Sequence, residues 1–377
     1  MRGRGTCVSR HAARTSISPP RWTASATSCT GSSAACSTNC ILSTAWGSSA
    51  IRRPSRDPSR EPEIELNLAF SDNIGPFAVS GYGWCGANHS YKEGQKVRTA
   101  YNERFSVRAN DRPVTGDVTL LADSVTVDVV NVILDPSRPL EDGELRDPLC
   151  RETVHYRIEG CNIEVSASHL FCNTAPVTIE TYYGMQSMFA NETQTFTSGG
   201  AYTDWTVQSG VSQFLKGDYP EFRRFVERNA SAYQSSFLLP GGLGDHGMLG
   251  DGDIVFIGNS SAKSYHKLIS RKRFENGDRI AWRGVYTWFA EPLADDAGLF
   301  CYEGAVAGRR ALFLDVRVAC SRMLELPSGL DARRFDLLDA NGDLRVEASG
   351  KSALRLSAGG PGGCVLLFGG EDGAEGE

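Results

Sequence analysis

The sequence predicts an all-β protein, a large antiparallel β-sandwich, and three observations support this. From residue 64 onward, segment after segment either alternates polar and apolar residues or is rich in β-branched residues, as strands are. Turns containing glycine, asparagine or aspartate separate these segments. Only one segment has the pattern of a helix, and a sheet with so many strands normally splits into two packed layers.

The predicted strands follow one another with short connections. Residues 63–70 alternate almost strictly, which indicates a strand with one buried face. Further strands are predicted at 118–121, 125–133, 153–158, 163–167, 177–183, 253–257, 280–289 and 311–318. After Pro327, short hairpins are predicted at 335–338, 344–346, 354–356 and 365–368.

One short helix is predicted near residues 218–229. Asp218 can cap it, and Pro220 suits its first turn. Phe222, Phe225 and Val226 would share one face of such a helix.

Charge divides the chain into unequal parts. Residues 1–60 contain nine arginines and a single acid, Asp57. The segment is rich in Ser, Thr and Ala and has neither helical nor strand periodicity. Three interpretations remain open for this segment: a basic disordered tail, a targeting peptide, or text read out of frame from a GC-rich gene, which the composition favours. We therefore expect a disordered or non-native segment at 1–61, a large sandwich domain at 62–326, and a small hairpin unit with a frayed tail at 327–377.

Composition excludes several classes of protein. The 377 residues carry 39 Lys+Arg against 45 Asp+Glu, a net charge of −6, which argues against a nucleic-acid binder that works by bulk positive charge. No apolar run is long enough for a membrane-spanning helix. Six histidines without a His-x-His pair, and cysteines without a Cys-x-x-Cys pair, predict neither a metal nor a cofactor. The oligomeric state is left open.

The cysteines bear weakly on the compartment. An odd number of them follows residue 61, and we expect mostly buried thiols, with one disulfide among Cys150, Cys161 and Cys172 left open. With no credible signal peptide, this favours the cytoplasm.

Four stretches combine glycine, aromatic and polar residues, which suits ligand contact. Each also has a plainer interpretation: a bulged turn, a core strand, a surface loop or a solvated strand end. The ligand-binding candidates are Trp84, His89, Tyr183, Trp205, Asp245 and Trp288. The acid, base or charge-neutralising candidates for catalysis are His246, His266, Tyr265 and Arg283.

Three of these motifs carry a resemblance to a family. Residues 182–189, the Gly242-Leu243-Gly244-Asp245-His246 loop and Ser264-Tyr265-His266 resemble the uncharacterised β-rich region that follows the hydrolase domain in some bacterial SGNH/GDSL-type proteins. The resemblance covers residues 62–377. In a shifted frame, residues 37–47 permit an Asp-x-Leu-His block similar to the one that supplies the triad acid and base of that family. The resemblance implies that the catalytic part lies upstream, and residues 62–377 contain neither a Gly-Asp-Ser block nor a Gly-x-Ser-x-Gly elbow.

The predicted sandwich is also similar in kind to galactose-mutarotase-like and polysaccharide-lyase supersandwich domains, which is an analogy of fold. Three functions remain open. The first is an accessory module that faces a carbohydrate or glycoconjugate and lacks its own nucleophile. The second is a carbohydrate-active lyase or epimerase, for which His246, His266, Tyr265 and Arg283 should converge in one groove. The third is a structural or surface-appendage protein.

Overall fold

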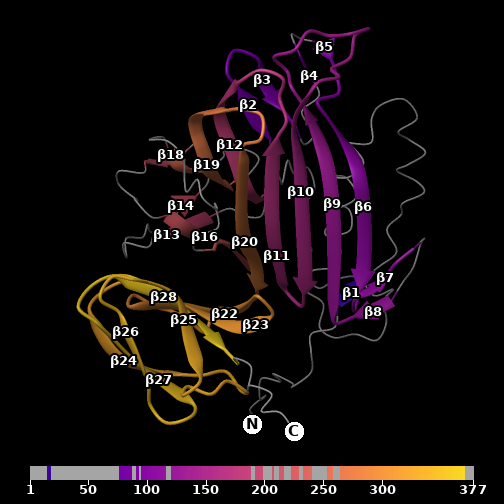
Figure 1. Cartoon of the computed structure of the whole chain (residues 1–377). Coiled ribbons are helices and arrows are strands. Elements are labelled where there is room, and N and C mark those ends of the chain that lie inside the picture. Colours follow the sequence, from indigo (N-terminus) through magenta and orange to yellow (C-terminus); the bar gives the residue numbers. More distant parts are fainter. Residues whose placement is uncertain are drawn as a thin grey trace.

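The computed structural model describes residues 15–17, 76–86, 91–92, 95–115, 120–187, 192–197, 206–207, 212–215, 222–228, 232–239, 253–257 and 264–369. All regular secondary structure in these ranges is β, and the strand pairs are antiparallel (Figure 1). No helix in these ranges could cross a membrane. The all-β antiparallel fold predicted from the sequence is confirmed.

The largest sheet has ten strands in the order β14-β13-β16-β17-β20-β11-β10-β9-β6-β7. Its strands are β6 (Ala100–Ala109), β7 (Arg112–Pro113), β9 (Ser124–Leu134), β10 (Pro148–Glu159), β11 (Asn162–Phe171), β13 (Glu192–Thr197), β14 (Thr206–Val207), β16 (Phe222–Arg228), β17 (Tyr233–Leu238) and β20 (Arg279–Phe289). Burial along β10 and β11 alternates residue by residue, as the sequence pattern predicts.

A six-stranded sheet in the order β15-β18-β19-β12-β2-β3 forms the second layer. Its strands are β2 (Phe77–Val79), β3 (Gly83–Cys85), β12 (Val177–Ser187), β15 (Ser212–Leu215), β18 (Asp253–Ile257) and β19 (Ser264–Phe274). Two small pairs accompany the large sheets: β1 (Thr15–Ile17) with β8 (Leu120–Ala122), and β4 (Tyr91–Lys92) with β5 (Gln95–Lys96).

The C-terminal part adds a five-stranded sheet, β21-β22-β23-β28-β25, and a three-stranded sheet, β24-β27-β26. The strands are β21 (Ala294–Asp295), β22 (Leu299–Val306), β23 (Arg309–Val316), β24 (Cys320–Glu325), β25 (Phe335–Asn341), β26 (Arg345–Ala348), β27 (Ala353–Ala358) and β28 (Gly362–Phe368). Because β23 pairs with β28 and β24 with β27, the domain boundary expected after residue 326 falls inside these two sheets.

The four larger sheets stack as layers, each bound to the next by an apolar core. Phe77 and Tyr182 of the six-stranded sheet pack with Val154 and Trp282 of the ten-stranded sheet. On the other face of the ten-stranded sheet, residues of β16, β17 and β20 pack against the five-stranded sheet. A further core joins the five-stranded to the three-stranded sheet. The C-terminal unit therefore covers only part of the large sheet and lies away from β6 and β9 (Figure 1). On the outer face of β9, Val132 packs with Leu140 and Leu145, while Glu103 and Arg151 on β6 and β10 are exposed.

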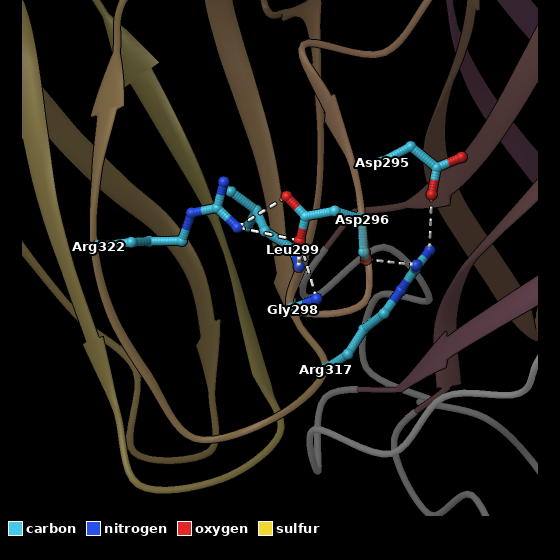
Figure 2. A network of polar contacts seen from close by, with 6 residues as sticks. All are labelled: Asp295, Asp296, Gly298, Leu299, Arg317 and Arg322. Carbon is cyan, nitrogen blue, oxygen red and sulfur yellow. Dashed lines mark hydrogen bonds and ion pairs between the residues drawn. The ribbon is translucent and has the colours of Figure 1, made fainter.

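A polar anchor fixes the C-terminal sheets to each other (Figure 2). The Asp296 carboxylate closes the β21–β22 turn by accepting hydrogen bonds from the backbone N–H groups of Gly298 and Leu299, at 2.8 and 3.0 Å. Arg322, on β24, donates to both oxygens of the same carboxylate. Arg317 donates to the Asp296 carbonyl at 2.9 Å. One side chain thus joins a turn of the five-stranded sheet to a strand of the three-stranded sheet.

The helix predicted near residues 218–229 is wrong, because residues 222–228 form strand β16. This strand is paired on both sides, with β13 and with β17. Phe225 faces the ring of His266 between the two large sheets, while Val226 packs on the opposite side against the five-stranded sheet. A strand buried on both faces places apolar residues at adjacent positions, and this pattern imitates the apolar face of a helix.

The other predicted strands that fall on described residues are confirmed, with extended ends. β9, β10, β11, β20 and β23 contain the predicted ranges or most of them. The strand predicted at 63–70 lies outside the described residues. Of the segment at 1–61, only the short strand β1 is described.

Candidate functional site

Two of the predicted ligand-binding residues, Trp84 and Tyr183, meet on the outer face of the six-stranded sheet. Their rings stack with centroids 5.4 Å apart and planes 24° from parallel. Trp84 lies on β3 and Tyr183 on β12, with β2 between them in the sheet. Both side chains are half-buried. We call these two residues, together with Tyr82, which lies two residues before Trp84, the aromatic shelf.

Small residues let the shelf form. Ala78 on β2 is the register partner of Trp84, and its methyl group leaves room for the two larger rings to meet. The β2–β3 hairpin turns through Gly81 and Gly83, both at positive φ (78° and 90°), where a side chain would strain the backbone. The turn presents Tyr82, which is 50% exposed. Tyr82 and Trp84 therefore lie on the hairpin at the sheet edge, and Tyr183 lies two strands further in, on β12.

The inner side of the same strands is closed core. Tyr182, next to Tyr183, points inward and stacks on Phe77 of β2 with centroids 4.7 Å apart. Its hydroxyl accepts a hydrogen bond from Trp282 Nε1 at 2.6 Å. Burial raises the pKa of Tyr182 well above its ordinary value, and the nearby Glu152 adds to this rise. Tyr182 is therefore a neutral anchor beneath the shelf.

A row of polar residues crosses the inner face of the ten-stranded sheet. Four successive strands contribute register partners to it: Asn102, Asn131, Glu152 and His169. Asn102 Nδ2 donates to Asn131 Oδ1 at 3.1 Å. Asn131 Nδ2 in turn donates to Glu152 Oε1 at 2.9 Å. Glu152 Oε2 lies 2.9 Å from His169 Nε2.

The inner end of this row is fully enclosed. Glu152 and His169 are both buried, and the imidazole packs edge-on against Phe77 and Tyr182. A buried polar group costs stability unless it is hydrogen-bonded, so the row is paired link by link. No ligand path to Glu152 or His169 follows from this geometry, and we interpret the row as a structural network. No group of three His, Cys, Asp or Glu side chains suited to a metal occurs in the part of the chain that the structure describes.

Trp288, predicted to face a ligand, lies in the core instead. It is 2% exposed and stacks with Tyr286, 5.9 Å between centroids, in the core between the two large sheets. The alternation of β20 explains this placement, because Trp282, Tyr286 and Trp288 occupy the face opposite Arg283. A ligand would reach Trp288 only by separating the two sheets.

The catalytic candidates on described residues do not converge. His266 on β19 is buried between the large sheets against Phe225. Arg283 on β20 points the other way, to the open face of the ten-stranded sheet, where its Nη2 donates to Glu164 Oε1 at 2.6 Å. Tyr265 is placed only by its backbone on β19, next to His266. His89, Trp205, Asp245 and His246 lie outside the described residues.

Burial lowers the pKa of His266 from its ordinary 6.5 to about 3, partly offset by a hydrogen bond with the backbone of Ser236. The folded protein thus keeps this imidazole neutral, while the unfolded chain takes up a proton below pH 6.5. As the pH falls from about 6.5 to 3, we expect His266 to lower the free energy of unfolding by roughly 1.4 kcal/mol for each pH unit. Urea unfolding of the wild type and of His266→Gln over this range measures the contribution.

The readout is the difference between the two pH profiles, since both share every other titrating group. The variant should be less dependent on pH on the acid side, whatever its stability at neutral pH. Parallel profiles would contradict a neutral, buried His266.

The described cysteines at 85, 150, 161, 172, 301, 320 and 364 are free thiols. Burial raises the pKa of the Cys85, Cys301 and Cys364 thiols far above the ordinary value, so these groups stay protonated and unreactive. The disulfide left open among Cys150, Cys161 and Cys172 is not formed in this structure.

Comparison with known proteins gives only distant likenesses. No protein-family model matches the chain, and no curated protein matches it. Among solved structures, an α-galactosidase from Lactobacillus brevis shares 10% identity over 66% of this chain and 37% of its own, with a TM-score of 0.36. A family 36 α-galactosidase from Geobacillus stearothermophilus also shares 10% identity, over 66% of this chain and 38% of its own, with a TM-score of 0.35. A polysaccharide lyase matches 81% of this chain and 46% of its own at 10% identity, with a TM-score of 0.24.

In each case the matched part spans less than half of the other protein. These are loose likenesses, and the fold of this chain rests on its own strands and cores.

Proposed function

We propose that this chain is a β-sandwich module that faces a carbohydrate or glycoconjugate through its aromatic shelf. The observation that carries the proposal is the stacked pair Trp84–Tyr183, held half-exposed on the outer face of the six-stranded sheet. A pyranose ring has apolar C–H faces and a polar rim, and such a ring packs well on flat, amphipathic aromatic side chains. A rigid hairpin that presents these rings reduces the ordering cost of binding.

The proposal assigns the module a binding role without bond cleavage. His266 on β19 lies between the two large sheets, whereas Arg283 on β20 lies on the outer face of the ten-stranded sheet. The two side chains therefore cannot form the one groove that a lyase or epimerase would need. We further propose that the module accompanies an SGNH/GDSL-type hydrolase, and this part is supported by the sequence resemblance of residues 182–189 and 264–266 alone.

Glycan-array binding of the full chain tests the proposal. We expect at least one neutral glycan to bind, and Trp84→Ala and Tyr183→Ala each to weaken that binding about tenfold or more, since each removes one stacking face (a tenfold change corresponds to about 1.4 kcal/mol). Tyr101→Ala is the matched control, because Tyr101 is a partly buried aromatic on the ten-stranded sheet that lies under Arg98. It should bind like the wild type.

Failure of every glycan to bind would refute the proposal. Equal weakening in Tyr101→Ala would show that the loss comes from general destabilisation and would count equally against the shelf.

A further inference from the structure

A second polar row crosses the open, outer face of the ten-stranded sheet, on the far side of the sandwich from the aromatic shelf. Five adjacent strands contribute successive register partners to it: Ser106, Asp128, His155, Ser166 and Arg283. These residues are far apart in sequence, and only the strand register unites them. Unlike the inner row, this one is open to solvent, since the side chains of His155 and Arg283 are 42% and 53% exposed.

The imidazole of His155 is held in one orientation. Its Nδ1 lies 2.7 Å from Asp128 Oδ1, and the other oxygen of Asp128 accepts from Arg108 Nη2 at 3.1 Å. Because the Asp128 carboxylate can only accept, the imidazole carries a hydrogen on Nδ1. The other ring nitrogen, Nε2, is the one turned toward solvent. Nε2 makes no hydrogen bond to any residue that the structure describes.

Arg283 is fixed in a similar way from the other side. Its Nη2 donates to Glu164 Oε1, and the second oxygen of Glu164 accepts from the Ala307 backbone N–H at 2.9 Å. Ala307 belongs to the C-terminal unit, which therefore braces this end of the row. The Nε and Nη1 groups of Arg283 have no hydrogen-bond partner among the described residues and remain available as donors.

Ser166 lies between these two groups in the row. Strands are spaced about 4.8 Å apart, so the backbones of His155 and Arg283 lie roughly 10 Å apart with Ser166 midway. That span accommodates one oxyanion that accepts from the Ser166 hydroxyl and from the Arg283 guanidinium, with the solvent-facing edge of the His155 ring beside it.

Charge around the row supports an anionic ligand. On the described strands β6, β9, β10, β11 and β20, this face carries six arginines (Arg104, Arg108, Arg151, Arg157, Arg279 and Arg283) against four carboxylates (Glu103, Asp128, Glu159 and Glu164), a balance of 6 − 4 = +2 in a chain whose net charge is −6. Each of these carboxylates is already paired with an arginine of the same face.

We propose that the outer face of β10, β11 and β20 binds an oxyanion, the carboxylate or sulfate group of an acidic ligand, over Ser166 between His155 and Arg283. The site is separate from the aromatic shelf and does not depend on the function proposed for it.

Direct binding of charged polymers to the full chain tests this site. The probes are polygalacturonate, which carries carboxylates, dextran sulfate, which carries sulfate esters, and uncharged dextran, all measured by calorimetry at low salt. We expect one of the two polyanions to bind and dextran not to bind by this face. Arg283→Ala should weaken polyanion binding about tenfold, as expected for the loss of one charge-assisted hydrogen bond, and His155→Ala and Ser166→Ala less.

Arg333→Gln is the matched control. Arg333 is an exposed arginine paired with Asp331 on the C-terminal unit, as Arg283 is paired with Glu164. It should leave binding unchanged, and thermal unfolding of each variant confirms that it is folded. Preference for polygalacturonate would identify a carboxylate site, and preference for dextran sulfate a sulfate site. Binding of neither polyanion, or equal loss in Arg333→Gln, would overturn the proposal.

Discussion

Replacing Asp315 by asparagine should lower the free energy of unfolding by about 3–5 kcal/mol, because it leaves the buried Arg224 guanidinium without its carboxylate. Arg224 on β16 and Asp315 on β23 form an ion pair across the junction between the ten-stranded and five-stranded sheets, and both side chains are buried. Burial raises the pKa of Asp315 to about 6, although Arg224 acts to lower it. At neutral pH both groups are thus charged.

The expected loss of stability in Asp315→Asn comes from burying the Arg224 charge without a carboxylate, more than from losing the attraction between the two side chains. The guanidinium also lies 5.3 Å from the Phe313 ring and 5.7 Å from the Tyr302 ring, and it is buried away from water. The double variant Arg224→Met/Asp315→Leu removes both charges and keeps most of the volume. It should recover most of the stability that either single variant loses.

Urea unfolding of the wild type, both single variants and the double variant measures this. Asp331→Asn is the control, because Asp331 pairs with Arg333 on the surface and its removal should not move the unfolding midpoint measurably. If the double variant lost as much as the sum of the singles, the pair would not be a coupled unit at the junction.

Replacing Glu152 by alanine should be the second large loss, about 3 kcal/mol or more. The change leaves Asn131 Nδ2 and His169 Nε2 without their partner in the middle of the inner row, and it opens a cavity between the two large sheets. Glu152→Gln should cost less, since the amide fills the same space and keeps an acceptor oxygen for Asn131.

Unfolding in urea distinguishes these cases, with Glu103→Ala as the control. Glu103 is a glutamate on β6, two strands away in the same sheet, and its ion pair with Arg151 lies on the exposed face, so its loss should cost less than about 1 kcal/mol. Similar losses for Glu152→Ala and Glu103→Ala would show that the buried row contributes little to stability.

Local pattern identified long strands such as β9, β10, β11 and β20 because alternation is a property of consecutive residues. It gave a helix at β16, where a strand is buried on both faces, and it predicted no strand at β6, β17, β19, β22 or β24. The exposed face of β6 carries Glu103 and Arg104, which hides the apolar pattern. The same reasoning placed Trp288 on a ligand surface, because a tryptophan in a strand has the same local sequence whether its face is covered or open.

The candidate sites divide in the same way. Trp84 and Tyr183 were nominated from glycine and aromatic content, but their stacking depends on Ala78 of the strand between them. His155, Asp128 and Ser166 were not nominated at all. The Asp128–His155 contact joins residues 27 positions apart, and the Arg283–Glu164 contact joins residues 119 positions apart.

By itself, the sequence determined the all-β class and the place of many strands and tight turns, since side-chain alternation and turn chemistry act over a few residues. The tertiary structure decided which strands are neighbours, which face of each is covered, and therefore which polar residues end in a core row and which in an open one. The physical reason is that strand register and sheet packing are set by contacts between segments distant in the chain, and a shift of one residue would move every side chain to the other face.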